Sequence, residues 1–280
     1  MAQHTPPKPQ YVAGVMGWPV QHSLSPKLHG YWLNHYEIQG RYDHLPVEPE
    51  NLEHALHSLF LNGYAGCNLT LPHKTAAMDY IDHLTDTAKE IGAVNTIVVQ
   101  DDGRLLGDNT DAYGFIKSLD AQCPDWHTHI KHALIIGAGG AAKAVIYGLK
   151  QHGITHITVA NRTLDKAQAL SPNACTLKDI APHIAQADLL VNTTSLGMTG
   201  QPDLDIDLSS AKKTLIVSDI VYTPRQTPLL QHAEKQGLHT VEGIDMLLYQ
   251  AVPGFKYWFG ITPEVTADLK NFILDEVKDT

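Results

Sequence analysis

The residues best suited to chemistry in this 280-residue sequence are polar side chains that stand where short apolar runs end. They are Asn68, Thr70, Lys74, Asn95 and Asp111. In open α/β sheets, ligands bind at the strand ends and the turns that follow them. Amides and hydroxyls there can form hydrogen bonds with a small polar ligand, and an ammonium or a carboxylate can transfer a proton.

Two serines stand at the predicted start of a helix. Ser25 fits the N-cap and Pro26 the first helical position, and apolar residues continue the helix through Tyr36. Hydroxyls and free amides at a helix N-terminus favour an anion, so Ser23 and Ser25 are candidate anion ligands. The same pattern also fits a Ser25 that only caps the helix.

A glycine-rich turn indicates a dinucleotide site. Ala133–Ile136 reads as a buried strand, and an Ala/Val/Leu-rich segment to Leu149 reads as the helix after the turn. Gly137 permits the tight turn, Gly139 lets backbone approach a pyrophosphate, and Ala142 lets helix and strand pack closely. A second predicted strand, 154–160, follows at the expected distance and completes the unit.

The end of this second strand predicts the cofactor. An NAD site usually carries a carboxylate there for the ribose 2′-hydroxyl. This chain has Asn161, Arg162 and Thr163 instead, with Lys166 one turn later. A guanidinium, a hydroxyl and an amide suit a 2′-phosphate, so we predict NADP(H). The alternative is that Arg162 is an ordinary solvated residue.

The remaining pattern predicts two α/β domains. Further strands are expected at 11–16, 41–47, 64–71, 91–99, 188–192, 214–219 and 238–241, and helices at 52–61, 111–119, 246–258 and 263–277. Residues 1–112 with 246–280 would form a substrate domain, and 113–245 a Rossmann-type, doubly wound nucleotide domain. No strand follows residue 241, so we expect the C-terminal helices to return to the first domain.

Composition narrows the class of protein. The chain is 43% apolar without a run near the ~18 residues of a membrane span. Its formal net charge of −10 argues against nucleic acid and anionic membranes as partners. The first ten residues lack the apolar core of a signal peptide and read as a loose tail. Three widely separated cysteines suit a reducing cytosol.

Seventeen histidines raise the question of a metal site. The densest groups are His54 with His57, expected on a helix surface, and three histidines between 127 and 132. No cysteine accompanies them and no HExxH motif occurs, so we predict no metal.

These motifs together resemble the shikimate dehydrogenase family, from Val12 to about Phe259. The matching stretches occur in one order in both halves of the chain: Gly17–Pro26, Gly66–Lys74, Gly92–Thr96, Asp108–Asp111, Gly137–Ala142, Asn161–Thr163, Asn192–Met198, Asp219–Pro224 and Met246–Ala251. The resemblance implies a cytoplasmic enzyme of the chorismate pathway to aromatic amino acids, a monomer or homodimer, that reduces 3-dehydroshikimate to shikimate with NADPH.

The resemblance also assigns roles to individual residues. Lys74 and Asp111 would be the catalytic pair. Substrate would be bound by Ser23, Ser25, Asn68, Thr70, Asn95, Asp111, Tyr222 and Gln250. The cofactor would contact Gly137, Ala138, Gly139, Gly140, Ala141, Asn161, Arg162, Thr163, Lys166, Thr193, Gly243 and Met246.

Two positions depart from the family pattern, and two rival functions stay open. Gly30 stands where Asn is frequent, and Asp245 where many members carry Gly near the nicotinamide. One rival is a quinate/shikimate dehydrogenase that prefers NAD, against which Arg162 argues. The other is a non-catalytic NADPH sensor, which would need neither Lys74 nor Asp111.

Overall fold

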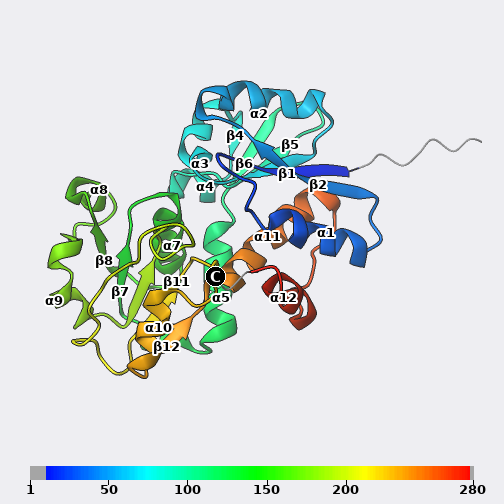
Figure 1. Cartoon of the computed structure of the whole chain (residues 1–280). Coiled ribbons are helices and arrows are strands. Elements are labelled where there is room, and N and C mark those ends of the chain that lie inside the picture. The colour runs from blue at the N-terminus through cyan, green and yellow to red at the C-terminus, as the bar shows by residue number, and fades with distance from the viewer. Residues whose placement is uncertain (1–10, 278–280) are drawn as a thin grey trace, which may run out of the picture. The chain divides into compact units, whose positions relative to one another are not determined.

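The computed structural model describes residues 11–277, so the predicted N-terminal tail lies outside the described residues (Figure 1). The chain separates into two compact units, each built on its own six-stranded sheet. The first unit runs to Thr110 and takes in Ala251–Leu269. The second holds Asp111–Gln250 and the chain from Lys270 onward. The functional domain boundaries at 112 and 245 stay predictions, because compactness alone does not show which unit binds which ligand.

The sheet of the first unit is mixed. Its strands, in spatial order, are β2 (Gly40–Pro46), β1 (Tyr11–Gly17), β3 (Gly66–Leu69), β5 (Thr96–Val99), β6 (Leu105–Asp108) and β4 (His83–Leu84). Strands β1, β2 and β3 are parallel, whereas β5 runs antiparallel to both β3 and β6. Because β5 is reversed, its first residue, Thr96, pairs with Asn68 near the carboxyl end of β3. This reversal brings Asn95 beside Asn68.

The helices of the first unit confirm most of the expected elements. They are α1 (Ser25–His35), α2 (Leu52–Leu61), α3 (His73–Ala76) and α4 (Asp86–Ile91), with single 3₁₀ turns at Pro49–Asn51 and Ala77–Tyr80. The predicted N-cap was wrong by one residue: Leu24 is the N-cap and Ser25 the first helical residue. The Leu28 amide already bonds to the Leu24 carbonyl at 3.0 Å, which starts the helix one residue earlier.

A single long helix, α11 (Gly243–Phe259), supplies the C-terminal cover of this sheet. The indole of Trp258 donates to the Ile97 carbonyl at 2.9 Å. Gly66 makes room for it: at φ +153°, an added Cβ would lie 2.3 Å from the Trp258 nitrogen and 2.0 Å from the Ile97 oxygen. The expected return of the C-terminal helices to the first domain is therefore confirmed for the second half of α11.

His29 of α1 is buried inside the aromatic cluster that α11 completes. Its ring stacks on Tyr42 with centroids 4.0 Å apart and planes 1° from parallel, and Phe255 and Trp258 lie within 6 Å. Among the described residues, neither ring nitrogen has a hydrogen-bond partner. Burial lowers the pKa of His29 from 6.5 to about 3, so the imidazole stays neutral.

This burial predicts acid sensitivity. Between pH 6.5 and about 3 the unfolded chain binds a proton at His29 that the folded chain does not, so stability falls as pH falls. His29→Phe lacks this titrating group. We therefore expect its free energy of unfolding, relative to that of the wild type, to increase by about 1.4 kcal/mol for each pH unit as the pH is lowered from 6 to 4. Urea unfolding at several pH values measures this, with His54→Phe on the exposed face of α2 as control. Parallel curves for His29→Phe and the wild type would contradict it.

The second unit has the doubly wound sheet that the glycine turn predicted. Its strands are all parallel, in the order β9 (Ala174–Thr176), β8 (His156–Asn161), β7 (His132–Ile136), β10 (Leu189–Asn192), β11 (Ile216–Asp219) and β12 (His239–Val241). In chain order this reads 3-2-1-4-5-6, the Rossmann arrangement. The order reverses between β7 and β10, where dinucleotides bind in this fold.

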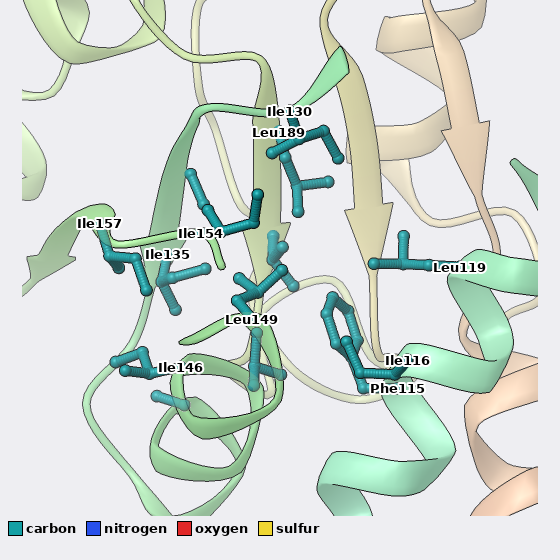
Figure 2. Close-up of a cluster of buried hydrophobic side chains, with 14 of the residues drawn as sticks. Phe115, Ile116, Leu119, Ile130, Ile135, Ile146, Leu149, Ile154, Ile157 and Leu189 are labelled. Atoms are coloured by element: carbon teal, nitrogen blue, oxygen red, sulfur yellow. The ribbon is translucent and has the colours of Figure 1, made fainter. Parts of the chain in front are cut away.

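Helices cover both faces of this sheet. They are α5 (Asp111–Gln122), α6 (Trp126–His129), α7 (Gly140–Gln151), α8 (Leu164–Gln168), α9 (Ala181–Ile184) and α10 (Pro228–Lys235). Along the chain, α11 is followed by α12 (Ala267–Leu274). Figure 2 shows Phe115 and Ile116 of α5 and Leu149 of α7 gathered with Ile135 of β7 on one face. Alternate residues of β7, such as Leu134, point to a second core. Burial on both faces explains the unbroken apolar run of this strand.

Three further observations concern the described residues 11–277. No helix among them is both long enough and apolar enough to cross a membrane. No three of their His, Cys, Asp and Glu side chains are grouped to hold a metal ion. All three cysteines are unpaired thiols, and Cys67 and Cys175 are buried.

Candidate active site

The carboxyl end of β3 carries a buried network of neutral polar groups. The Asn68 Nδ2 donates to the Asn95 carbonyl and to the Thr96 hydroxyl, both at 3.1 Å, and its Oδ1 accepts from the Tyr42 hydroxyl at 2.6 Å. The Asn95 Oδ1 accepts from the Thr96 hydroxyl at 2.9 Å and from the Thr110 amide at 2.8 Å. Asn68 and Asn95 are 5% and 1% exposed, so both amides are held before any ligand arrives.

Lys74 stands on the helical turn α3, which two contacts hold in place. A cis bond precedes Pro72, the residue before the turn begins. The Lys74 carbonyl accepts from the Val94 amide at 2.7 Å, and the His73 ring bonds to the Val47 carbonyl at 2.8 Å. Burial lowers the pKa of His73, which favours the neutral imidazole that donates this bond. The backbone that carries Lys74 is thereby tied to the segment that carries Asn95.

The candidate anion ligands lie in the loop before α1, which carries Ser23, and at the first residue of that helix, Ser25. The Ser23 hydroxyl donates to the Ser25 hydroxyl at 3.2 Å and accepts from the Ser25 amide at 3.3 Å. Thr70 joins the ends of β1 and β3, because its amide bonds to the Met16 carbonyl at 2.9 Å. An added Cβ at Gly17 would lie 2.4 Å from the Thr70 methyl, so a side chain at Gly17 would displace Thr70.

Three predicted substrate ligands belong to the second unit. Asp111 is the first residue of α5 and is 4% exposed. Gln250 lies on α11, where Gly114 lets α5 approach closely, since a Cβ on Gly114 would lie 2.6 Å from that of Gln250. Tyr222 follows β11, and burial raises its pKa. Lys74 belongs to the first unit, so its pairing with Asp111 stays a prediction.

The glycine turn after β7 has room for a ligand. Gly137 adopts φ +110°, and an added Cβ would lie 2.6 Å from the Thr193 hydroxyl, which donates to the Ile136 carbonyl at 2.6 Å. Packing therefore requires Gly137. Gly139, the N-cap of α7, is different: an added Cβ would meet no atom within 4 Å. Open space above helix amides fits the approach of a pyrophosphate.

The end of β8 presents two cations. The Asn161 Nδ2 donates to the Thr163 carbonyl at 2.9 Å, which fixes the start of the turn. Arg162 and Lys166 are exposed, and neither makes a hydrogen bond or ion pair with another residue of the described chain. With no protein carboxylate bonded to them, both side chains can bind a phosphate. This donor set fits the 2′-phosphate of NADP(H).

Asp245, one of the two departures from the family pattern, lies near the start of α11 and has a partner of opposite charge. Asp245 is 4% exposed, and Lys270 of α12 lies 2.7 Å from its carboxylate, so its charge is balanced within the unit. Gly243 packs tightly: an added Cβ would lie 2.6 Å from the Ile220 and Val221 carbonyl oxygens. Met246 is 8% exposed and belongs to the same buried hydrophobic cluster as Ile135 and Leu149.

Gly30, the other departure, has a simpler environment. An added Cβ at this position of α1 would meet nothing within 4 Å. Helix packing therefore does not require glycine at this position.

A buried carboxylate at the end of β11 was not singled out as a site from the sequence. Asp219 accepts from the Asn192 amide at 3.0 Å, the Val221 amide at 3.0 Å and the Thr227 hydroxyl at 2.8 Å. Burial raises the pKa of Asp219 to about 6, although these three bonds act in the other direction. Asp219 thus ties the end of β10 to the loop that carries Tyr222 and to the N-cap of α10. The sequence held one signal for this contact: Asp219 ends a predicted strand, and Thr227-Pro228 after it has the form of a helix N-cap.

The fold and these sites define a dehydrogenase with a Rossmann-type nucleotide unit and a separate α/β unit that carries a polar ligand set. Three family descriptions match the chain: the shikimate dehydrogenase substrate binding domain over residues 15–97, shikimate/quinate 5-dehydrogenase over 121–242, and the shikimate 5′-dehydrogenase C-terminal domain over 243–270. The chain belongs to the shikimate dehydrogenase family.

Individual members of this family match the chain over nearly its full length. The shikimate dehydrogenase (NADP(+)) of Rhodospirillum rubrum is 51% identical over 273 residues, which cover 94% of this chain and 96% of that protein. A shikimate dehydrogenase crystallised with NADP+ superposes with a TM-score of 0.88 at 32% identity and covers 96% of both chains. The shikimate 5-dehydrogenase of Thermus thermophilus, solved with NADP(H) and shikimate, superposes with a TM-score of 0.85 at 34% sequence identity. The match covers 94% of this chain and 98% of that chain.

Proposed function

We propose that this chain reduces 3-dehydroshikimate to shikimate with NADPH, and runs the reverse reaction with NADP+, in aromatic amino acid biosynthesis. The observation that carries the proposal is the combination of a fixed lysine turn and a buried amide network in one unit. Lys74 follows β3, and its backbone bonds to Val94, next to Asn95. A ketone reductase needs such a proton donor beside groups that hold the substrate rigidly.

The substrate would be held mainly by neutral groups. Its carboxylate would bind at Ser23, Ser25 and Tyr222, where hydroxyls meet helix amides. Its ring hydroxyls would bind to the remaining predicted ligands, namely Asn68, Thr70, Asn95, Asp111 and Gln250. Amides and hydroxyls recognise hydroxyl groups without adding net charge, which suits a substrate that already carries one carboxylate.

The proton and the hydride would come from different sources. NADPH, when bound, supplies the hydride. Lys74 would donate a proton to the ketone oxygen as negative charge develops there, and its ammonium stabilises that charge before the transfer is complete. Asp111 would orient Lys74 and hold the neighbouring hydroxyl. In the reverse direction, neutral Lys74 would take the proton back.

The cofactor would be bound by the second unit. The turn from Gly137 to Ala141 would receive the pyrophosphate. Arg162 and Lys166, with Asn161 and Thr163, would bind the 2′-phosphate, and Thr193, Gly243 and Met246 would line the nicotinamide. We also infer the functional domains predicted above, 1–112 with 246–280 for substrate and 113–245 for cofactor, in a cytoplasmic monomer or homodimer.

Initial rates of the purified enzyme test this function against its nearest rival. The assay compares shikimate and quinate, each with NADP+ and with NAD+, by the absorbance of the reduced cofactor. We expect the highest kcat/KM for shikimate with NADP+, because cations and no carboxylate bind the ribose end. Faster turnover of quinate with NAD+ would support the rival dehydrogenase, and binding of NADPH without turnover would support a sensor.

Gln250 gives a test of the substrate set. Its side chain donates to the Leu247 carbonyl at 3.0 Å, within its own helix. Gln250→Ala should raise KM for shikimate about 10-fold, because one hydrogen-bonding group is lost, with little change in KM for NADP+. Gln231→Ala on the exposed face of α10 is the control. An unchanged KM for shikimate would remove Gln250 from the substrate set.

A further inference from the structure

The hydrogen bonds of Asn68 leave its side chain only one way to bind a ligand. Both Nδ2 hydrogens have acceptors at 3.1 Å, the Asn95 carbonyl and the Thr96 hydroxyl. Its Oδ1 accepts one hydrogen, from Tyr42. An amide oxygen has two lone pairs, so one lone pair of Oδ1 remains. Asn68 can therefore accept a hydrogen from a ligand but cannot donate one without breaking this arrangement.

The direction of these bonds is set by groups that cannot exchange roles. The Asn95 backbone carbonyl is only an acceptor, so the NH₂ of Asn68 must face it. The Thr110 backbone amide is only a donor, so the Oδ1 of Asn95 must face it at 2.8 Å. The single hydrogen of Thr96 has two acceptors within reach, that same Oδ1 at 2.9 Å and the Thr110 hydroxyl at 3.3 Å, and with either one Thr96 is left to accept from Asn68. A flipped Asn68 amide would place oxygen against oxygen.

Tyr42 completes this arrangement from β2, which is separated from β3 by β1. Its hydroxyl lies 2.6 Å from the Asn68 Oδ1, and the residue is 7% exposed. Its ring stacks on His29, with centroids 4.0 Å apart, and lies 5.9 Å from the ring of Trp258. The aromatic cluster therefore fixes the ring, and the ring fixes the position of the hydroxyl.

We propose that Tyr42 is a positioning residue that holds the Asn68 carboxamide with one Oδ1 lone pair available, so that Asn68 binds only a hydroxyl that donates to it. The proposal rests on the proposed function, in which Asn68 contacts the substrate. It adds a selectivity rule. The ketone oxygen of 3-dehydroshikimate is an acceptor, so it cannot face Asn68, whereas a ring hydroxyl that stays a hydroxyl throughout the reaction can.

The variant Tyr42→Phe tests this role with little disturbance, because it keeps the stacked ring and removes one hydroxyl. We expect KM for shikimate to rise about 5- to 10-fold, the usual effect of losing one neutral hydrogen bond, while KM for NADP+ stays within 2-fold. Tyr64→Phe is the matched control. It also removes a hydroxyl that bonds at 3.0 Å, but to Asp43, outside the Asn68 network.

A double-mutant cycle shows whether Tyr42 acts through Asn68. If it does, adding Tyr42→Phe to Asn68→Ala should change the dissociation constant of shikimate less than 2-fold, because the positioned group is already gone. Calorimetric titration of shikimate measures this constant without turnover, so the result does not depend on the proposed reaction. An equal effect of Tyr42→Phe in both backgrounds, or no effect in the wild type, would overturn the proposal.

Substrate analogues test the acceptor rule itself. Each ring hydroxyl of shikimate is replaced in turn by hydrogen or by fluorine, which accepts but cannot donate. At the hydroxyl that faces Asn68, fluorine should bind more weakly than hydrogen, because two acceptors would then meet, and Asn68→Ala should remove that difference. A fluoro analogue that binds better than the deoxy analogue at every position would overturn the rule, even if wild-type turnover of shikimate is normal.

Discussion

Lys74→Ala should lower kcat by roughly 10²–10⁴, the usual contribution of general acid–base catalysis, with a much smaller change in KM. The physical reason is the division of roles within the site. Asn68 and Asn95 are fixed by their own hydrogen bonds, so in the proposed site they would still bind the substrate when the Lys74 side chain is removed. Steady-state kinetics in both directions measures the effect.

The fold should survive this change. The turn α3 is held by the Lys74 backbone carbonyl and by His73, and alanine preserves the first contact and leaves the second untouched. Lys89→Ala, at an exposed lysine of the same unit that pairs with Asp86, is the control and should keep normal kinetics. Asp111→Asn should impair both KM and kcat. A near-normal kcat in Lys74→Ala would show that Lys74 is not the proton donor, and the role would then pass to Asp111 or to water.

Arg162→Asp should weaken the binding of NADPH by about 3 kcal/mol, which is more than 100-fold in Kd, and should weaken the binding of NADH far less. Arg162 is exposed and makes no ion pair within residues 11–277, so its replacement breaks no protein contact. The introduced carboxylate would repel a 2′-phosphate and could accept from the 2′-hydroxyl of NADH. Titration of protein fluorescence with each cofactor measures the two constants.

A charge-matched variant separates the local effect from net charge. Lys178→Asp, at an exposed position of the same unit, changes the charge by the same two units and should affect NADPH and NADH little. If Arg162→Asp lost affinity for NADPH and for NADH by the same factor, Arg162 would not be part of the 2′-phosphate site. Another group would then have to distinguish NADPH from NADH.

The nucleotide unit was predictable because its signals are local. A buried strand such as β7 reads as an unbroken apolar run, and Gly137 marks the turn that no other residue accommodates beside Thr193. The following strand and its cations stand within one short βαβ unit. Local sequence therefore determined both the type and the order of the elements.

The amide network of the first unit was only partly predictable. Asn68 and Asn95 were expected at strand ends, but the antiparallel direction of β5, which brings them together, is a long-range property. The strand predicted from Ile91 begins only at Thr96, because Ile91 ends α4 and Gly92 follows in a left-handed conformation. Tyr42 gave no local signal, since a tyrosine in a strand is ordinary.

Short elements and buried charges were missed for related reasons. Strands β4 and β9 have two and three residues, too few to show an alternating pattern. Asp219 looks like any strand-terminal carboxylate until folding buries it among Asn192 and Thr227. Such groups become recognisable only when the partners from distant segments are known.

The most direct test of the central claim follows the hydride itself. The enzyme is mixed with NADP+ and shikimate that carries deuterium at the carbon to be oxidised, and the products are examined by mass spectrometry. We predict that the deuterium appears in NADPH, and that the other product is 3-dehydroshikimate without it. Deuterium retained in unreacted shikimate, with no reduced cofactor formed, would contradict the account.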